Sequence, residues 1–218
     1  MNKKEQIKQL ICDQKLLPLY YHDSSDVSVN VLKALYHAGI KAVEYTNRGP
    51  NAFDNFKVLR QIVNDEMPGM KLGIGTIKSV ADVEKFIIAG ADFIVCPIVN
   101  AEVAVFVHKA ELLWIPGSMT PTEIYTAETN GATLIKIFPG SVLGPSYISA
   151  IKELFPGILF MPTGGVELDK ENLQAWFSAG ICAVGMGSKL ISKSFLNNQE
   201  YDKIESLTKE VLLILGSV

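Results

Sequence analysis

The sequence lacks the features that would place it in several large protein classes. Its only cysteines, Cys12, Cys96 and Cys182, are far apart and form no C-x-x-C pair, so neither a disulfide framework nor a zinc site is indicated. The longest apolar run, 93–99, counts seven residues including its proline, whereas a membrane span needs roughly 20. Charges at six of the first 15 positions leave no apolar signal region. These absences predict a cytoplasmic protein without a membrane segment.

Neither an excess of one charge nor a histidine cluster is present. The chain has 20 Lys and Arg against 23 Asp and Glu, a formal charge of −3, which offers no basic surface for nucleic acid or an anionic membrane. His22, His37 and His108 are too scattered for a metal centre. The pairs Gly73-x-Gly75 and Gly185-x-Gly187 lack the third glycine of a dinucleotide fingerprint. We therefore expect no metal, no cofactor and no nucleic-acid partner.

Short apolar runs alternate with helical segments along the whole chain. The expected strands are Leu16–Tyr20, Ala42–Thr46, Leu72–Thr76, Phe93–Pro97, Leu113–Gly117, Leu134–Pro139, Ile158–Gly164 and Ala183–Ser188. Eight strand–helix units in 218 residues average about 27 residues each, enough for a strand, a helix and two short loops. This arithmetic favours an α/β fold, a single closed (β/α)₈ TIM barrel, over an open doubly wound sheet. No linker or charge block divides the chain, so one domain over 1–218 is predicted.

Helix ends can be located from the same pattern. Glycines at four positions precede the next strand by one to three residues and fit left-handed helix C-caps: Gly39, Gly90, Gly131 and Gly180. Three N-caps are expected, at Asp26, Ser79 and Thr120. An extra N-terminal helix within 1–15 presents Ile7, Leu10 and Ile11 on one face. We expect this helix to close the bottom of the barrel.

Polar residues in two of the expected strands point to chemistry at the carboxyl ends, where barrels carry their active sites. Period-two alternation places Glu44, Thr46 and Arg48 on one face. Lys136 stands alone in an apolar strand, and desolvation favours the neutral amine that can attack a carbonyl carbon. Glu44 lies at a matching height and could be its partner. The alternatives are an internal ion pair that only holds a loop and a lysine that reaches solvent from an edge strand.

The loops after the last two expected strands are rich in glycine. Gly164 and Gly165 follow one strand, and Gly187 and Ser188 follow the other. Consecutive backbone N–H groups in such loops can cradle phosphate, and barrels often hold phosphate at this position. The alternative is a pair of plain turns. We expect these four residues to bind the substrate.

Six motifs, in order, carry a resemblance to a known family. They are Glu44-x-Thr46-x-Arg48, Gly73-x-Gly75-Thr76, Pro116-Gly117 followed by Thr120-Pro121-Thr122-Glu123, Lys136-x-Phe138-Pro139, Pro162-Thr163-Gly164-Gly165, and Gly185-x-Gly187-Ser188. Over nearly its whole length the chain resembles the 2-keto-3-deoxy-6-phosphogluconate (KDPG) / 4-hydroxy-2-oxoglutarate (KHG) aldolase family. The resemblance implies a metal-free class I aldolase of Entner–Doudoroff carbohydrate metabolism, on a (β/α)₈ barrel that is commonly a homotrimer.

The resemblance also implies roles for particular residues. Lys136 would be the Schiff-base lysine and Glu44 the proton shuttle. Arg48 and Thr76 would hold the carboxylate of pyruvate. Two further residues, Phe138 and Thr163, would shape the pocket.

The expected function is a lyase that reversibly cleaves a 2-keto-4-hydroxy acid. A KDPG-like phosphorylated sugar acid would give pyruvate and glyceraldehyde 3-phosphate, and 4-hydroxy-2-oxoglutarate would give pyruvate and glyoxylate. One alternative is a phosphosugar isomerase or epimerase on the same barrel without a covalent intermediate. Another is a non-catalytic phosphate-binding barrel. Lys136 and Glu44 together favour the aldolase, and the two glycine loops favour a phosphorylated substrate.

Overall fold

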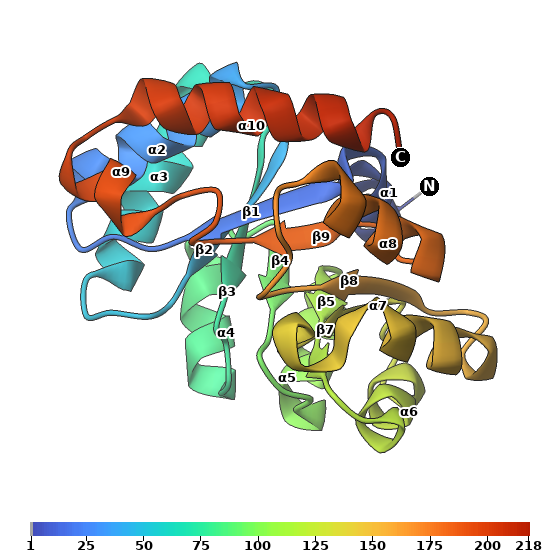
Figure 1. Ribbon diagram of the computed structural model, residues 1–218. Helices are drawn as coiled ribbons and strands as arrows, with labels where there is room; N and C mark the ends of the chain where they lie inside the picture. The colour runs from blue at the N-terminus through green and yellow to red at the C-terminus, as the bar shows by residue number, and fades with distance from the viewer. Residues whose placement is uncertain (1) are drawn as a thin grey trace.

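The computed structural model describes residues 2–218 as an α/β fold of parallel strands with helices around them (Figure 1). The strands are β1 (Leu16–Tyr20), β2 (Ala42–Thr46), β3 (Lys71–Gly75), β4 (Phe93–Val95), β5 (Leu113–Ile115), β6 (Gly117–Ser118), β7 (Leu134–Ile137), β8 (Leu159–Pro162) and β9 (Val184–Met186). The helices are α1 (Lys3–Gln14), α2 (Ser25–His37), α3 (Ala52–Glu66), α4 (Val80–Ile88), α5 (Ala101–Lys109), α6 (Pro121–Thr129), α7 (Gly140–Ile151), the 3₁₀ turn η1 (Lys152–Leu154), α8 (Lys170–Ala179), α9 (Lys193–Asn197) and α10 (Tyr201–Leu215).

The predicted α/β class is confirmed, but the predicted closed eight-stranded barrel is wrong. The strands form two parallel sheets, one of six strands in the order β5-β4-β3-β2-β1-β9 and one of three strands in the order β6-β7-β8. The six-stranded sheet curls into an incomplete barrel, and the three-stranded sheet lies beside it. Each of the eight predicted strands is present, with ends that differ by a few residues.

The hydrogen-bond ladder is interrupted at two places, which explains the difference. The predicted strand 113–117 is split at Pro116, which has no N–H group to donate to a neighbouring strand. Its carbonyl oxygen instead accepts a hydrogen bond from the Lys136 N–H group at 2.9 Å, so the chain changes partner strand here. On the other side, a single bridge between Thr163 and Gly185 joins the three-stranded sheet to β9.

Most of the predicted helix ends are confirmed. All four C-terminal glycines have positive φ, at 105° for Gly39, 91° for Gly90, 84° for Gly131 and 106° for Gly180. Ser79 and Thr120 are N-caps, and Thr120 forms a capping box with Glu123. The prediction of Asp26 is wrong, because Ser24 caps α2 and Asp26 lies in its first turn.

Apolar side chains form two separate clusters. The larger cluster fills the space between the strands and the surrounding helices. The smaller one lies inside the curve of the strands and includes Ile7 and Ile11 of α1, with Leu10 packed against it. The predicted N-terminal helix is therefore present and covers the interior at the amino-terminal ends of the strands. Within residues 2–218, no helix combines the length and hydrophobicity that crossing a bilayer requires.

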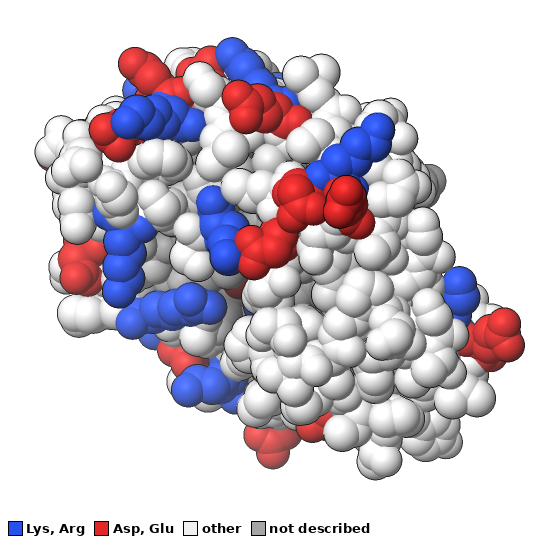
Figure 2. Space-filling model, in the orientation of Figure 1, with Lys and Arg blue, Asp and Glu red and all other residues white. Residues whose placement is uncertain are grey.

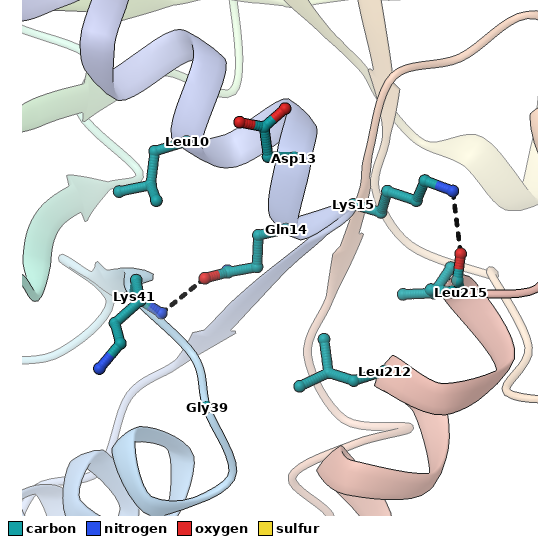
Figure 3. Close-up of a pocket in the computed structure, with 9 residues that line it drawn as sticks. Leu10, Asp13, Gln14, Lys15, Gly39, Lys41, Leu212 and Leu215 are labelled. Atoms are coloured by element: carbon teal, nitrogen blue, oxygen red, sulfur yellow. Dashed lines mark hydrogen bonds between the residues drawn. The ribbon is translucent and has the colours of Figure 1, made fainter.

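Polar contacts at the end of α1 tie it to β2 and α10 (Figure 3). The Gln14 Oε1 atom accepts hydrogen bonds from the N–H groups of Lys41 at 2.6 Å and Ala42 at 3.0 Å. The Lys15 ammonium group donates to the carbonyl oxygen of Leu215 at 2.9 Å. These contacts position the helix that closes this end of the fold.

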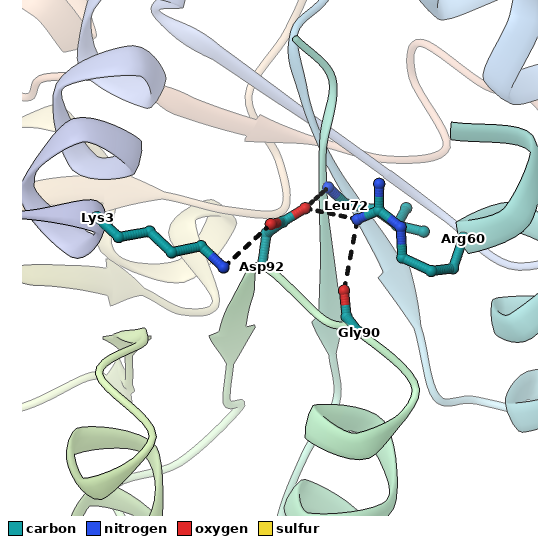
Figure 4. Close-up of polar contacts among 5 residues, drawn as sticks. All are labelled: Lys3, Arg60, Leu72, Gly90 and Asp92. Atoms are coloured by element: carbon teal, nitrogen blue, oxygen red, sulfur yellow. Dashed lines mark hydrogen bonds and ion pairs between the residues drawn. The ribbon is translucent and has the colours of Figure 1, made fainter. Parts of the chain in front are cut away.

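A second polar cluster ties α1 to α3 and to the start of β3 (Figure 4). Asp92 lies just before β4, and its Oδ2 atom is 2.7 Å from Arg60 Nη1 and accepts a hydrogen bond from the Leu72 N–H group at 3.0 Å. Its Oδ1 atom is 3.5 Å from Lys3 Nζ. The buried carboxylate therefore has partners on both oxygens, as a buried charge requires.

Candidate active site

Glu44 and Lys136, the pair that the sequence analysis indicated, lie on different sheets. Glu44 lies on β2 of the six-stranded sheet, in register with Leu19 of β1 and Gly73 of β3. Lys136 lies on β7, the central strand of the three-stranded sheet, in register with Gly117 and Met161. Both side chains point into the space that the two sheets enclose, where they meet.

Lys136 and Glu44 form a buried ion pair. The Lys136 Nζ atom is 3.9 Å from the Glu44 Oε1 atom, and the side chains are only 4% and 1% exposed. This burial excludes the alternative of an edge-strand lysine that reaches solvent. The distance is too long for a direct hydrogen bond, and neither Glu44 oxygen has a hydrogen-bond partner within residues 2–218. Buried polar atoms normally have partners, so this carboxylate has the capacity to accept a hydrogen bond from a bound molecule.

Glycines on neighbouring strands make room for the polar side chains. A Cβ atom on Gly75 would overlap the Glu44 carboxylate. A Cβ atom on Gly185 would overlap the Thr163 hydroxyl group, which is buried and also without a hydrogen-bond partner in the described chain. The glycines of the sequence motifs therefore set where the functional groups can stand.

The environment of Glu44 makes its carboxylate easier to protonate. Burial raises the pKa of Glu44 above its ordinary value of 4.5, and the positive charges of Lys136 and Arg48 oppose this shift. The result is a carboxyl group that takes up a proton more readily than an exposed glutamate does, which suits a group that moves protons.

Arg48 and Thr76 meet at the mouth of the site. The Arg48 Nε atom donates a hydrogen bond to the Thr76 hydroxyl group at 3.4 Å. Thr76 has a φ of 62° in the left-handed region, where a β-branched residue is rarely found. Such strain is typical of positions whose geometry serves a site. The structure thus brings these two predicted residues together after β2 and β3.

A cavity of about 260 Å³ opens beside these groups. Its lining residues are Leu19, Arg48, Phe138, Thr163, Gly164, Gly165, Val166, Gly185, Met186, Gly187, Ser188 and Lys189. Seven of the predicted substrate-binding residues, all but Thr76, are among them. Lys136 and Glu44 are not among the lining residues, but the Lys136 Nζ atom lies 5.2 Å from the centre of the Phe138 ring, so the pair is next to this cavity.

Several lining residues were not predicted from the sequence. Leu19 follows Leu17 by two positions, so alternation along β1 could have indicated it. Val166, Met186 and Lys189 are neighbours of the glycine motifs, but no pattern in the sequence separates them from other loop residues. Within residues 2–218, no group of three His, Cys, Asp or Glu side chains is placed to hold a metal ion.

Comparison with known proteins gives a consistent assignment. The family model described as KDPG and KHG aldolase matches residues 7–207. A probable 2-dehydro-3-deoxy-6-phosphogalactonate aldolase of Rhizobium meliloti is 35% identical over 161 residues, covering 73% of this chain and 74% of the relative. A 2-dehydro-3-deoxy-phosphogluconate aldolase of Pseudomonas aeruginosa is 30% identical over 215 residues, covering 96% and 93%.

Solved structures agree with this result. A 4-hydroxy-2-oxoglutarate / 2-dehydro-3-deoxyphosphogluconate aldolase superposes with a TM-score of 0.81 at 28% identity, over 95% of this chain and 97% of the other. The predicted aldolase activity, of the lyase class, is confirmed, and the isomerase or epimerase alternative finds no support among these relatives. By the match over most of its length, this chain belongs to the KDPG and KHG aldolase family.

Proposed function

We propose that the protein cleaves a 2-keto-3-deoxy-6-phospho sugar acid, KDPG or its galactonate epimer, to pyruvate and glyceraldehyde 3-phosphate by class I chemistry. We propose 4-hydroxy-2-oxoglutarate as a poorer substrate. The observation that carries the proposal is the buried Lys136–Glu44 pair, at 3.9 Å, beside a cavity with an arginine at its mouth. An amine and a carboxyl group held this way suit a reaction that needs a nucleophile and a proton shuttle.

The first half of the proposed reaction forms the Schiff base. The neutral amine of Lys136 attacks the C2 carbonyl carbon, and the resulting carbinolamine loses water to give an iminium ion. Arg48 can hold the substrate carboxylate with two parallel hydrogen bonds, which orients the carbonyl group toward Lys136. Thr76, which accepts the Arg48 hydrogen bond, keeps the guanidinium group in place.

The second half breaks the carbon–carbon bond. Glu44 accepts the proton of the C4 hydroxyl group, and the electrons of the C3–C4 bond move to the iminium nitrogen, so that the aldehyde leaves and an enamine remains. The protonated Glu44 then returns a proton to C3, and water releases pyruvate from Lys136. The free oxygens of Glu44 fit this role, because no other described residue occupies them.

The far end of the cavity supports a phosphorylated substrate. Gly164, Gly165, Gly187 and Ser188 line the cavity from the loops after β8 and β9, and the far end is the part of the cavity that these four residues line. Backbone N–H groups and one hydroxyl group form a donor set that suits a tetrahedral dianion. We expect a phosphorylated substrate to have a kcat/KM about 10²–10⁴-fold higher than 4-hydroxy-2-oxoglutarate, and equal values would exclude a working phosphate site.

Borohydride reduction in the presence of pyruvate tests the covalent step. We expect one reduced pyruvyl unit per chain in the intact mass, located on the peptide that contains Lys136. The Lys136→Met variant should form no adduct and show no cleavage, while an exposed lysine variant, Lys170→Met, should behave as wild type. An adduct that persists in Lys136→Met would contradict the assignment.

Association and location extend the proposal. We propose a homotrimer, supported by a broad face without charged side chains over α6 and α7 (Figure 2). Tyr125 and Val142 on these helices are 60% and 65% exposed, and exposed apolar patches often mark contacts between subunits.

We also propose a cytoplasmic location, which the three free thiols of the described chain support. Because the site draws on residues from β2 to β9, we propose that the chain is one domain.

A further inference from the structure

One ion pair at the edge of the cavity has no part in the chemistry above. The Lys189 Nζ atom is 2.8 Å from the Glu167 Oε1 atom. Glu167 lies in the loop between β8 and α8, and Lys189 directly follows Ser188 after β9. The pair therefore bridges the two loops that carry the glycine motifs.

The two partners differ in their relation to the cavity. Lys189 lines it, whereas Glu167 does not. Glu167 is held from behind, because its N–H group donates a hydrogen bond to the Asn172 side chain at 3.0 Å. The backbone that carries Glu167 is thus held in place on the loop, while Lys189 reaches the rim of the cavity on a flexible side chain.

Lys189 is also the cation best placed for the far end of the cavity. Among the lining residues, the other cation is Arg48, which donates a hydrogen bond to Thr76 and which we assign to the substrate carboxylate. Ser188, the neighbour of Lys189, starts a turn in which the N–H groups of Leu190 and Ile191 donate to the Gly187 carbonyl oxygen. The first N–H groups of such a turn have no acceptor within it and are able to donate to an anion.

The strength of the ion pair decides whether Lys189 can leave it. The side chains of Lys189 and Glu167 are 52% and 45% exposed, and an ion pair at such a site contributes little. A phosphate dianion offers a lysine more charge than one carboxylate does. When a phosphate dianion is bound at the glycine loops, Lys189 therefore gains by exchanging Glu167 for the phosphate group.

We propose that Lys189 determines specificity for the charge at the far end of the substrate, and that Glu167 competes with the substrate for it. In the free enzyme Lys189 pairs with Glu167, and in the complex it pairs with the phosphate group. Glu167 also repels the arriving anion, so it lowers affinity at the same time as it holds the lysine. This inference rests on the proposed use of a phosphorylated substrate.

The proposal predicts opposite effects for two substitutions that break the same ion pair. Lys189→Met should lower kcat/KM for the phosphorylated sugar acid about tenfold, mainly through KM, because the contact is far from the reacting bond. Glu167→Gln should raise it about two- to fivefold, because it frees the lysine and removes a repulsive charge. If the pair only held the loops together, both substitutions would lower the value.

Steady-state cleavage of the phosphorylated sugar acid and of its unphosphorylated counterpart measures these effects. Neither substitution should change kcat/KM for the unphosphorylated acid, and Lys189→Arg should restore at least half of the wild-type value for the phosphorylated one. Lys193→Met, which removes an exposed lysine four residues away, serves as the charge control and should match wild type. Raising the salt concentration should weaken the Lys189 effect, since it screens exposed charges.

Two failures can be told apart. Wild-type enzyme that cleaves both acids equally well would contradict the proposed substrate class. A wild-type preference for the phosphorylated acid that is undiminished in Lys189→Met, or a loss of activity in Glu167→Gln, would overturn the role of Lys189 alone. Pyruvate trapping by borohydride does not use the far end of the cavity, so it should be unchanged in every variant of this series.

Discussion

The interior between the strands has two halves with opposite character. At the amino-terminal ends, inward side chains such as Ala42 and Leu134 belong to an apolar cluster that α1 covers. Two residues further along the same strands are Glu44 and Lys136, and the buried Thr163 directly follows β8. One step of the period-two alternation separates a packed core from a reactive centre.

The difference shows how one fold divides stability and function. The apolar half removes surface from water, which stabilises the folded chain. The reactive half buries charges and leaves the Glu44 oxygens and the Thr163 hydroxyl group without partners in the described chain, which costs stability. We therefore expect substitutions in the first half to change the free energy of unfolding and substitutions in the second half to change activity.

The largest expected effect is that of Glu44→Gln on catalysis. This substitution keeps the shape of the side chain and removes its proton transfer, so kcat should fall about 10²–10⁴-fold. Because the pKa of Glu44 is raised above 4.5, the carboxylate is lost as the pH falls through that raised value. The acidic limb of the wild-type kcat/KM profile should therefore lie above pH 4.5, and it should be absent in Glu44→Gln. A fall of less than about threefold would make Glu44 structural.

A smaller effect, on stability rather than on activity, is expected for Ile11→Ala. Ile11 is fully buried in the apolar half, and truncation of such a side chain leaves a cavity that costs about 2–5 kcal/mol. Urea unfolding should show this loss, while kcat at 25 °C stays within about twofold of wild type. Leu213→Ala, at a side chain 76% exposed on α10, is the control and should change the unfolding free energy by less than about 0.5 kcal/mol. A large fall in kcat for Ile11→Ala would break the division between the halves.

The smallest expected effect sharpens the division, because it changes no functional group. In Gly75→Ala the new methyl group overlaps the Glu44 carboxylate and must displace it, so kcat should fall about tenfold. Gly157→Ala has open space around it and should be neutral. Far-ultraviolet circular dichroism should be the same for both variants. Wild-type kcat in Gly75→Ala would show that the position of Glu44 is not critical.

Much of this arrangement could be predicted from local sequence patterns. Alternation along 42–46 placed Glu44 and Thr46 on one face, and the isolated Lys136 stood out against its apolar neighbours. The glycine loops were found because glycine motifs follow the last two strands. These predictions succeeded because strand periodicity and burial are properties of a few adjacent residues.

What could not be predicted depends on pairs that lie far apart in the chain. Whether the strands close into a barrel depends on which neighbouring strand each backbone group bonds to. At Pro116 the chain changes its partner strand, and a count of strands does not reveal such a change. The Glu167–Lys189 ion pair joins two loops across an intervening helix, and neither residue lies in a recognisable motif. That the Glu44 oxygens have no hydrogen-bond partner in the described chain likewise depends on the folded arrangement of several strands.

The division of the strands into two sheets also has a mechanical consequence. Glu44 belongs to one sheet and Lys136 to the other, so their 3.9 Å separation measures how the two sheets are placed relative to each other. One of the two junctions contains a single bridge, Thr163 to Gly185, and regions with few ladder hydrogen bonds open most easily. A change in the placement of the sheets alters the distance between the amine and the carboxyl group even when each sheet keeps its own structure. The distance between Lys136 and Glu44 therefore depends on the junctions between the two sheets and not on either sheet alone.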